Sequence, residues 1–163
     1  MEDNYCGKNI MEYSIKIMDD TNIGCLARLA AEARLEGFNF VQRTIDEWGE
    51  GVNRFSGRGE ILWGVFDDGQ CIGIGGLNID PYANDPKVGR VRHVYVSKSY
   101  RNRGVASNLL EMVVKRSKDS FKVLRVSTHK PGQANAEADR FYEFIGFVKA
   151  EGEKQTHILN FKG

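Results

Sequence analysis

The stretch VYVSKSYRNRGVA, at positions 94–106, joins a strand pattern to a helix pattern through a short basic turn. Val94, Tyr95 and Val96 are β-branched or aromatic residues, which are common in strands. After the turn, the apolar positions recur three and four residues apart, which is the spacing of one helix face. These positions are Val105, Ala106, Leu109, Leu110, Val113 and Val114. The stretch therefore predicts a strand that leads into the N-terminus of an amphipathic helix.

The turn between these two elements is a candidate anion-binding site. A helix N-terminus leaves backbone N–H groups unpaired and carries a partial positive charge. Gly104 and Ala106 have almost no side chain, so an anion can approach those N–H groups, and Arg101 and Arg103 add positive charge. The turn lacks the Gly-Lys-Ser/Thr sequence of a metal-nucleotide P-loop. Two interpretations follow: a pyrophosphate site built from backbone, or a basic surface turn that precedes a helix.

The pattern Arg101-x-x-Gly104-x-Ala106, set between a strand and an amphipathic helix, resembles the cofactor motif of the GNAT superfamily of N-acetyltransferases. In that superfamily the loop holds the pyrophosphate of acetyl-coenzyme A. The resemblance covers residues 60–161 and hardly extends to the helices predicted before them.

A second motif lies on the last predicted helix. Asn135 and Tyr142 are seven residues apart, which places them within about 20° of each other on a helix surface. Ala138 shares that face and is small. Taken alone, Tyr142 is better interpreted as a half-buried core tyrosine. Together with Gly146 and Phe147, however, these residues are similar to the closing cofactor motif of the same superfamily.

The resemblance implies a role for each matching segment. The backbone of residues 94–96 pairs with the pantetheine arm of the cofactor, and residues 102–107 wrap its pyrophosphate. The Asn135 side chain bonds the cofactor arm, and Tyr142 protonates the departing thiolate. The implied cofactor-binding residues are Val94, Tyr95, Val96, Arg101, Asn102, Arg103, Gly104, Val105, Ala106, Ser107, Asn135 and Ala138.

At the position of the general base, this sequence departs from the simplest pattern of the superfamily. Many relatives carry a glutamate on the strand before the pyrophosphate loop, whereas here that strand has no carboxylate. His93 is a substitute with a reference pKa near 6.5. Simple alternation places it on the opposite face from Val94 and Val96, and a bulge would change that parity. His129, at the end of the following strand, and a chain of water molecules are the other candidates.

Two arginines on the same strand bear on the acceptor. Arg90 and Arg92 are two residues apart and so lie on one face of a regular strand. Two guanidinium groups beside the thioester would favour an acceptor amine that also carries a carboxylate or phosphate. Solvation of a sheet edge is the alternative interpretation of both residues.

Composition limits the other classes of function. The 163 residues carry 23 Lys+Arg and 22 Asp+Glu. The net charge of +1 therefore creates no overall electrostatic attraction to nucleic acid or to a membrane surface. No run of apolar residues is long enough to span a membrane. Cys6, Cys25 and Cys71 match neither a disulfide framework nor a zinc site, which favours reduced thiols in a cytoplasmic protein without a metal. Residues 1–12 are polar and patternless and are expected to be a mobile tail, with Met11 as an alternative start, before one domain over residues 13–163.

Hydrophobic periodicity predicts the order β-α-α-β-β-β-α-β-α-β-β. The second helix is expected from Val41 to Phe55, and residues 67–70 are expected to form a hairpin turn. Glycines 73, 75 and 76 predict a bulge or a close backbone contact, since no helix follows them. We therefore expect an α/β fold of the GNAT type, with a mixed central sheet of six to seven strands flanked by four helices.

These observations predict an acetyl-CoA-dependent N-acetyltransferase that transfers the acetyl group directly to a primary amine of a small molecule, with acetyl-CoA as co-substrate. No cysteine lies near either motif, which argues against an acyl-cysteine intermediate. A protein or peptide amine as acceptor is one alternative, and a non-catalytic acyl-CoA-binding regulatory domain is another. The identity of the acceptor stays open, and so does the oligomeric state, with a homodimer among the expectations.

Overall fold

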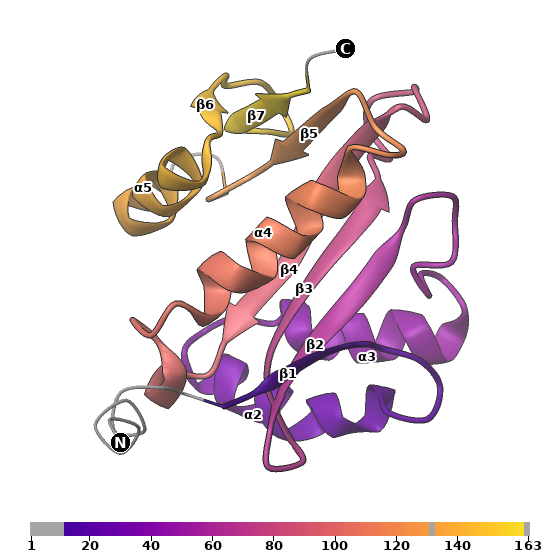
Figure 1. Ribbon diagram of the computed structural model, residues 1–163, viewed down its shortest axis with the longest axis vertical. Helices are drawn as coiled ribbons and strands as arrows, with labels where there is room; N and C mark the ends of the chain where they lie inside the picture. Colours follow the sequence, from indigo (N-terminus) through magenta and orange to yellow (C-terminus); the bar gives the residue numbers. More distant parts are fainter. Residues whose placement is uncertain (1–11, 131–132, 162–163) are drawn as a thin grey trace, which may run out of the picture.

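The computed structural model describes residues 12–130 and 133–161, which form one seven-stranded sheet and four α-helices (Figure 1). This confirms the predicted mixed sheet flanked by four helices. The tail expected over residues 1–12 lies outside the described residues, except for Glu12. None of the described helices is long and apolar enough to cross a membrane.

The elements follow the predicted order. The strands are β1 (Ser14–Ile17), β2 (Ile61–Asp67), β3 (Gln70–Ile79), β4 (Val88–Val96), β5 (Val123–Val126), β6 (Val148–Lys149) and β7 (His157–Asn160). The α-helices are α2 (Leu26–Leu35), α3 (Phe40–Glu50), α4 (Val105–Ser117) and α5 (Ala136–Ile145). Two 3₁₀ turns, η1 (Ile23–Cys25) and η2 (Lys98–Tyr100), precede α2 and α4.

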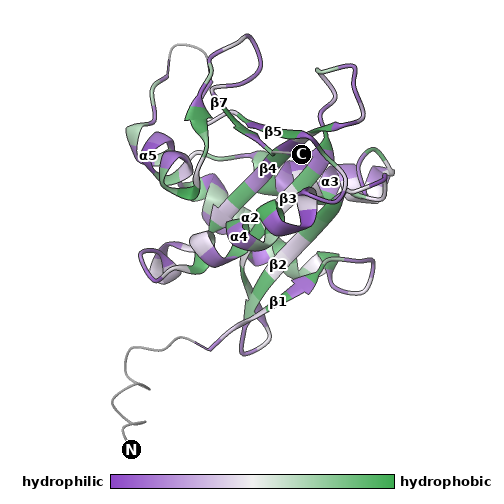
Figure 2. Ribbon diagram, turned by 45° about the horizontal axis from the view of Figure 1, so that its top comes forward, coloured by the Kyte–Doolittle hydropathy of each residue, from purple (hydrophilic) through white to green (hydrophobic). Residues whose placement is uncertain are grey.

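The helices divide between the two faces of the sheet, in the spatial order β1-β2-β3-β4-β5-β7-β6. On one face, Leu109 and Leu110 of α4 pack with Val91 of β4 and with Tyr142 of α5 in a single buried cluster. The other face is covered by α2 and α3, whose buried residues form a second cluster. Figure 2 shows hydrophobic colour along the central strands between these layers. The sheet is therefore the middle layer of an α/β sandwich.

Strands β4 and β5 are the one parallel pair among the described strands, and they soon part. Their pairing runs over three positions, from Val88 with Val123 to Arg90 with Arg125. Beyond Arg90, β4 continues to Val96 with β3 on one side, while its other edge has no paired strand among the described residues. Figure 1 shows the two strands diverging below their common upper end. The parting opens the middle of the sheet toward helix α5.

A β-bulge lies in β4 where the strands have parted. Ile74 of β3 pairs with Tyr95 and Gly76 pairs with Arg92, so Gly75 faces two residues of β4. His93, one of the two, has a φ of +60°. The bulge shifts the alternation of the strand. As a result, Val91 packs on the α4 side together with Val94, whereas His93 contacts Phe40 on the α3 side.

Two local predictions have different outcomes. The turn at residues 67–70 is a two-residue hairpin, with φ of +51° at Asp68 and +80° at Gly69, as a type I′ turn requires. The helix expected to reach Phe55 ends at Glu50, because Gly51 adopts a left-handed conformation with φ of +76° and caps it. Phe55 is still buried, but it reaches the core from the following loop.

The contact between α4 and the sheet depends on Leu109. Its side chain is fully buried, and a Cβ on Gly75 would lie 2.8 Å from its Cδ2 atom, so the glycine is what admits the leucine. We expect Leu109→Ala to lower the free energy of unfolding by about 2 to 5 kcal/mol, because it leaves a cavity in the core. Denaturant unfolding checks this. Leu35→Ala, at a side chain that is 90% exposed, should change the value by less than about 0.5 kcal/mol.

Candidate active site

A cavity of about 370 Å³ lies where β4 and β5 part. Residues of β4 from Arg90 to Tyr95 form one wall, and residues 126–128 form the opposite wall. Helix α5 closes one side, and the segment from α2 to α3 closes another. The remaining lining residues are Phe38, Phe40, Arg43, Tyr82, Asn135, Ala138 and Tyr142. The structure thus brings the β4 segment and the α5 motif, about forty residues apart in sequence, to one cavity.

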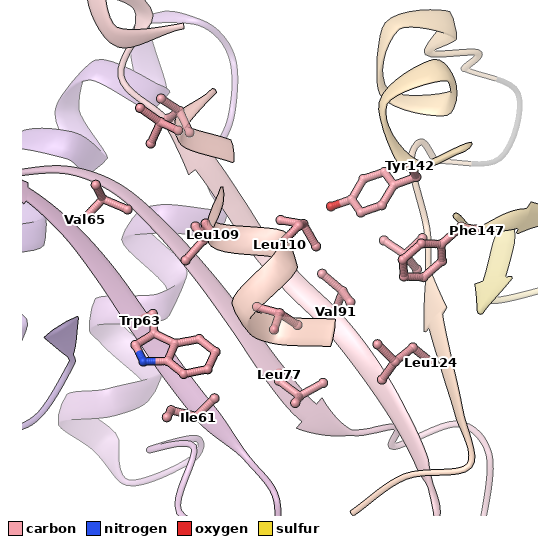
Figure 3. Packing of buried hydrophobic residues seen from close by; sticks show 14 of the residues in the cluster. Ile61, Trp63, Val65, Leu77, Val91, Leu109, Leu110, Leu124, Tyr142 and Phe147 are labelled. Carbon is pink, nitrogen blue, oxygen red and sulfur yellow. The ribbon is translucent and has the colours of Figure 1, made fainter. Parts of the chain in front are cut away.

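Tyr142 is positioned by aromatic packing on α5. Its ring contacts Phe141 and Phe147 edge to face, with centroids 5.1 and 5.4 Å away. Figure 3 shows the ring extending from α5 with its hydroxyl directed toward the side of the molecule that holds Leu110. Burial raises the pKa of the Tyr142 phenol, and no described residue hydrogen-bonds its hydroxyl. The phenol is therefore a protonated donor held at the cavity wall.

Asn135 and Ala138 lie on the same helix face as Tyr142 and line the cavity, as their spacing predicts. Asn135 is also the N-cap of α5, because its Oδ1 accepts a hydrogen bond from the Ala138 N–H at 3.1 Å. The first role of its side chain is thus to begin the helix that carries Tyr142. The contact to a cofactor arm that the resemblance implies for Asn135 stays a prediction.

A polar network centred on buried His157 joins α5 to the sheet. His157 of β7 is fully buried, and its Nε2 lies 2.8 Å from Oε2 of Glu143 on α5. Its Nδ1 lies 2.8 Å from Oγ1 of Thr156, which in turn lies 3.1 Å from Oγ1 of Thr128 at the cavity wall. The Thr128 hydroxyl also donates to Asp139 of α5. Such a fully paired network holds one arrangement of the helix and therefore of Tyr142.

The loop before α4 has the backbone geometry of an anion site. Asn102 and Gly104 have φ of +62° and +81°, and Gly104 is the N-cap of the helix. None of the N–H groups of residues 102–107 donates a hydrogen bond to another described residue. A Cβ on Gly104 would meet no atom within 4 Å. Successive free N–H groups at a helix N-terminus attract an anion such as a phosphate.

The Arg101 side chain points to a different partner. Its Nη1 and Nη2 donate to both carboxylate oxygens of Glu36, at 3.0 and 2.6 Å, and its Nε donates to the Val96 carbonyl at 2.9 Å. The Tyr95 hydroxyl also donates a hydrogen bond to Glu36, at the end of α2, and Tyr95 itself lines the cavity. These bonds hold the pKa of Glu36 below its usual range, with Arg101 the larger cause. The guanidinium of Arg101 therefore fastens the loop to α2, whereas Arg103 lies over the Tyr100 ring.

His93 lines the cavity from the bulge, between the rings of Phe40 and Phe55, whose centroids lie 6.0 and 6.3 Å from its own. Its Nε2 is buried without a hydrogen-bond partner among the described residues. An imidazolium needs acceptors for two N–H groups, so this environment opposes protonation. Burial, followed by the charges of Arg92 and Arg43, lowers the pKa of His93 to about 3. His93 is thus uncharged at neutral pH and a poor store for a proton.

The other histidine and arginine candidates have local partners. His129 is not among the cavity-lining residues, and its Nδ1 lies 2.9 Å from the Lys130 carbonyl. Arg90 does line the cavity, but its guanidinium contacts buried Asp80 at 3.5 Å and donates to the Lys154 carbonyl at 2.5 Å. Of the two β4 guanidinium groups predicted to face the acceptor, Arg90 is therefore occupied by its own partners, and Arg92 is left.

Sequence reasoning missed one wall of the cavity. Phe38 lies between α2 and α3, and Phe40 and Arg43 lie in the first turn of α3, outside the stretch that carried the family resemblance. Tyr82 comes from the loop between β3 and β4. The Phe38 side chain is 44% exposed. The sequence feature that could have indicated this wall is the pair of aromatic residues on either side of Asn39, between two amphipathic helices.

Known proteins share this arrangement. The sequence profile described as the acetyltransferase (GNAT) family matches residues 26–147. A structure assigned as an acetyltransferase, from Exiguobacterium sp. 255-15, is 28% identical, with a TM-score of 0.76 over 92% of this chain and 94% of that one. A GNAT-family acetyltransferase from Staphylococcus aureus Mu50 is 16% identical, with a TM-score of 0.70 over 93% and 100%. The PaiA N-acetyltransferase from Thermoplasma acidophilum, solved with coenzyme A, is 16% identical, with a TM-score of 0.65 over 93% and 100%.

The fold and the profile match define the class of protein. The profile spans most of the chain, and the structural relatives align with nearly all of it. This chain belongs to the GNAT acetyltransferase family.

The anion site before α4 can be tested with coenzyme A. Coenzyme A at millimolar concentration should raise the melting temperature, because it binds only the folded state. We expect Gly104→Val to remove most of this shift, since the new side chain would occupy the space in front of the free N–H groups. Gly51→Val is the matched control, because it introduces a similar backbone strain, at φ of +76°, at the far end of α3. An unchanged shift in Gly104→Val would contradict the assignment.

The low pKa of His93 predicts a pH dependence of stability. Below about pH 6.5 the unfolded chain binds a proton at this histidine that the folded chain does not, down to about pH 3. The stability present above pH 6.5 is therefore lost as the pH falls. His93→Asn cannot titrate, so the difference in unfolding free energy between the two proteins should change by about 1.4 kcal/mol per pH unit in this window. Urea unfolding from pH 7 to 4 measures it, and two parallel curves would show that the pKa is not lowered.

Proposed function

We propose that this protein is an acetyl-CoA-dependent N-acetyltransferase that transfers the acetyl group directly to a primary amine of a small molecule. The observation that carries the proposal is that the unpaired β4 edge and Tyr142 line one cavity, while β4 leads directly into the loop whose N–H groups are free. A coenzyme A complex of a structural relative supports the same cofactor.

The residues fit such a co-substrate in three places. Residues 102–107 would hold its pyrophosphate, because their N–H groups are free and Gly104 leaves the approach open. The free edge of β4 beyond Arg90 would pair with the amides of the pantetheine arm, as an added strand pairs with a sheet edge. The thioester supplies the activated acetyl group. Backbone N–H groups at the bulge are candidates for stabilising the oxyanion that forms on it.

Tyr142 is the candidate acid. When the thioester C–S bond breaks, the thiolate needs a proton, and a buried phenol at the cavity wall can donate it. For deprotonation of the amine, the low pKa of His93 favours water over the histidine. We therefore propose that the amine loses its proton to solvent before it attacks.

Two alternatives make different predictions. A protein or peptide acceptor would require the α2–α3 wall, including the exposed ring of Phe38, to receive a chain segment. A non-catalytic acyl-CoA-binding domain would bind coenzyme A but release no thiol. Thiol release from acetyl-CoA with a panel of small amines, with an N-terminal peptide and without an acceptor separates the three.

Tyr142→Phe tests the acid. The ring packing against Phe141 and Phe147 is kept, so the fold and the affinity for coenzyme A should be unchanged. We expect kcat to fall about ten- to a thousandfold, as measured by thiol release at saturating acceptor. Tyr13→Phe, which removes a hydroxyl that contacts Asn108 outside the cavity, is the control. A kcat within twofold of the unaltered enzyme would mean that the Tyr142 hydroxyl is structural.

A further inference from the structure

The acceptor side of the cavity is positively charged and aromatic. Arg43 projects from α3 and Arg92 from the bulged part of β4, and both line the cavity together with Phe38 and Phe40. No aspartate or glutamate is among the residues that line it. We call Arg43 and Arg92 the cavity arginines. A cationic acceptor would meet two like charges here without a compensating carboxylate.

Two neighbouring arginines have carboxylate partners, whereas the cavity arginines have none among the described residues. Arg90, two residues before Arg92, contacts Asp80, and Arg101 is bonded to Glu36 through two nitrogens. Within the described residues, neither of the cavity arginines hydrogen-bonds or forms an ion pair with a carboxylate. Guanidinium groups that face a cavity in this state are suited to a planar or tetrahedral oxyanion, which they can bind through two N–H groups.

His93 lines the same cavity as both cavity arginines. Their charges are the two causes, after burial, that lower the pKa of its imidazole. The same field acts on any amine placed beside His93, and it lowers the pKa of that amine. An acceptor that brought its own anion would satisfy the arginines, while its amine would still be disfavoured as an ammonium ion.

The cofactor is a less suitable partner for this pair. Arg92 lies four residues before the end of β4, and so about 13 Å along the strand from the loop whose free N–H groups suit a pyrophosphate. Arg43 lies on α3, on the opposite face of the sheet from α4. The phosphates of coenzyme A and the cavity arginines therefore belong to different ends of the opening.

We infer that the acceptor is a primary amine that carries a carboxylate or phosphate group, and that Arg92 and Arg43 bind this anion. The inference rests on the proposed function and adds the chemical class of the acceptor. The aromatic rings of Phe38, Phe40 and Tyr82 would pack against the apolar body of the acceptor between its amine and its anion.

Matched amines test this class. The first set is 4-(aminomethyl)benzoate, its primary amide, its phosphonate analogue and p-xylylenediamine, and the second is β-alanine, phosphoethanolamine, ethanolamine and ethylenediamine. Within each set the amine and spacer are alike and the end group is carboxylate, phosphate-like, neutral or cationic. We expect kcat/KM for an acidic member to exceed that of its neutral partner about ten- to a hundredfold. The acidic amine with the higher kcat/KM, carboxylate or phosphate-like, identifies the anion that the site binds.

Variants assign the preference to the cavity arginines. Arg92→Gln and Arg43→Gln should each lower the ratio of kcat/KM for the acidic amine to kcat/KM for its neutral partner about tenfold, because the ratio cancels an effect on the amine that both acceptors share. The affinity for coenzyme A should stay within twofold. Arg92→Glu should reverse the order and favour the diamine. Arg116→Gln, at an exposed arginine near the end of α4, is the matched control.

A second measurement separates this inference from the proposed function. An acidic amine should raise the melting temperature of the coenzyme A-bound protein, and Arg92→Gln should abolish that rise. Transfer with a preference for the neutral or cationic amine would overturn the inference and leave the proposed function intact. A thermal shift without transfer to any amine would support the anion site and overturn the proposed function. Loss of coenzyme A affinity in the arginine variants would assign them to the cofactor and overturn the inference.

Discussion

The parting of β4 from β5 is the constraint on which the rest of the structure depends. A buried strand edge without a partner is costly, because each unpaired backbone N–H or C=O loses its hydrogen bond to water. Here the pairing ends at Arg90, and β4 continues to Val96 along an opening instead of a neighbour. The free edge of β4 therefore faces an opening, and the two strands form opposite walls of the cavity.

Charged pairs hold both ends of this opening in place. At the closed end, buried Asp80 contacts Arg90 at 3.5 Å and Arg125 at 3.7 Å, which links β4 to β5 at their last paired position. At the open end, Glu36 binds Arg101 and joins the loop before α4 to helix α2. Removal of Arg90 or Arg125 would leave the buried Asp80 carboxylate with less compensation and would be strongly destabilising. These pairs also explain why Arg90 is not free to act on a ligand.

The sequence was most informative where one local rule decides the structure. The apolar spacing of α4 predicted a buried face, and Val105, Leu109, Leu110 and Val113 are buried. Residues 67–70 predicted a hairpin turn, and the structure has one, with positive φ angles at Asp68 and Gly69. The α5 face with Asn135, Ala138 and Tyr142 was predicted from spacing alone, and all three residues line the cavity.

The features that sequence could not give depend on contacts between distant elements. Alternation cannot locate the bulge that puts Val91 and Val94 on one side of the sheet, because the bulge depends on Gly75 facing two residues of β4. The length of α3 depended on Gly51 adopting a left-handed conformation, which overrides an apolar spacing that continues beyond it. The place of Arg43 required knowing that α3 packs on the same opening as β4.

The electrostatics of the cavity connect these elements in a single chemical consequence. The arginine charges and the burial that keep His93 neutral also disfavour an ammonium ion beside it, so the site lowers the cost of deprotonating an amine without holding the proton itself. For Tyr142, burial raises the pKa instead of lowering it, because a buried phenol resists losing its proton. The cavity therefore favours an uncharged nucleophile on one side and a protonated donor on the other, which are the two protonation states that direct transfer from a thioester to an amine requires.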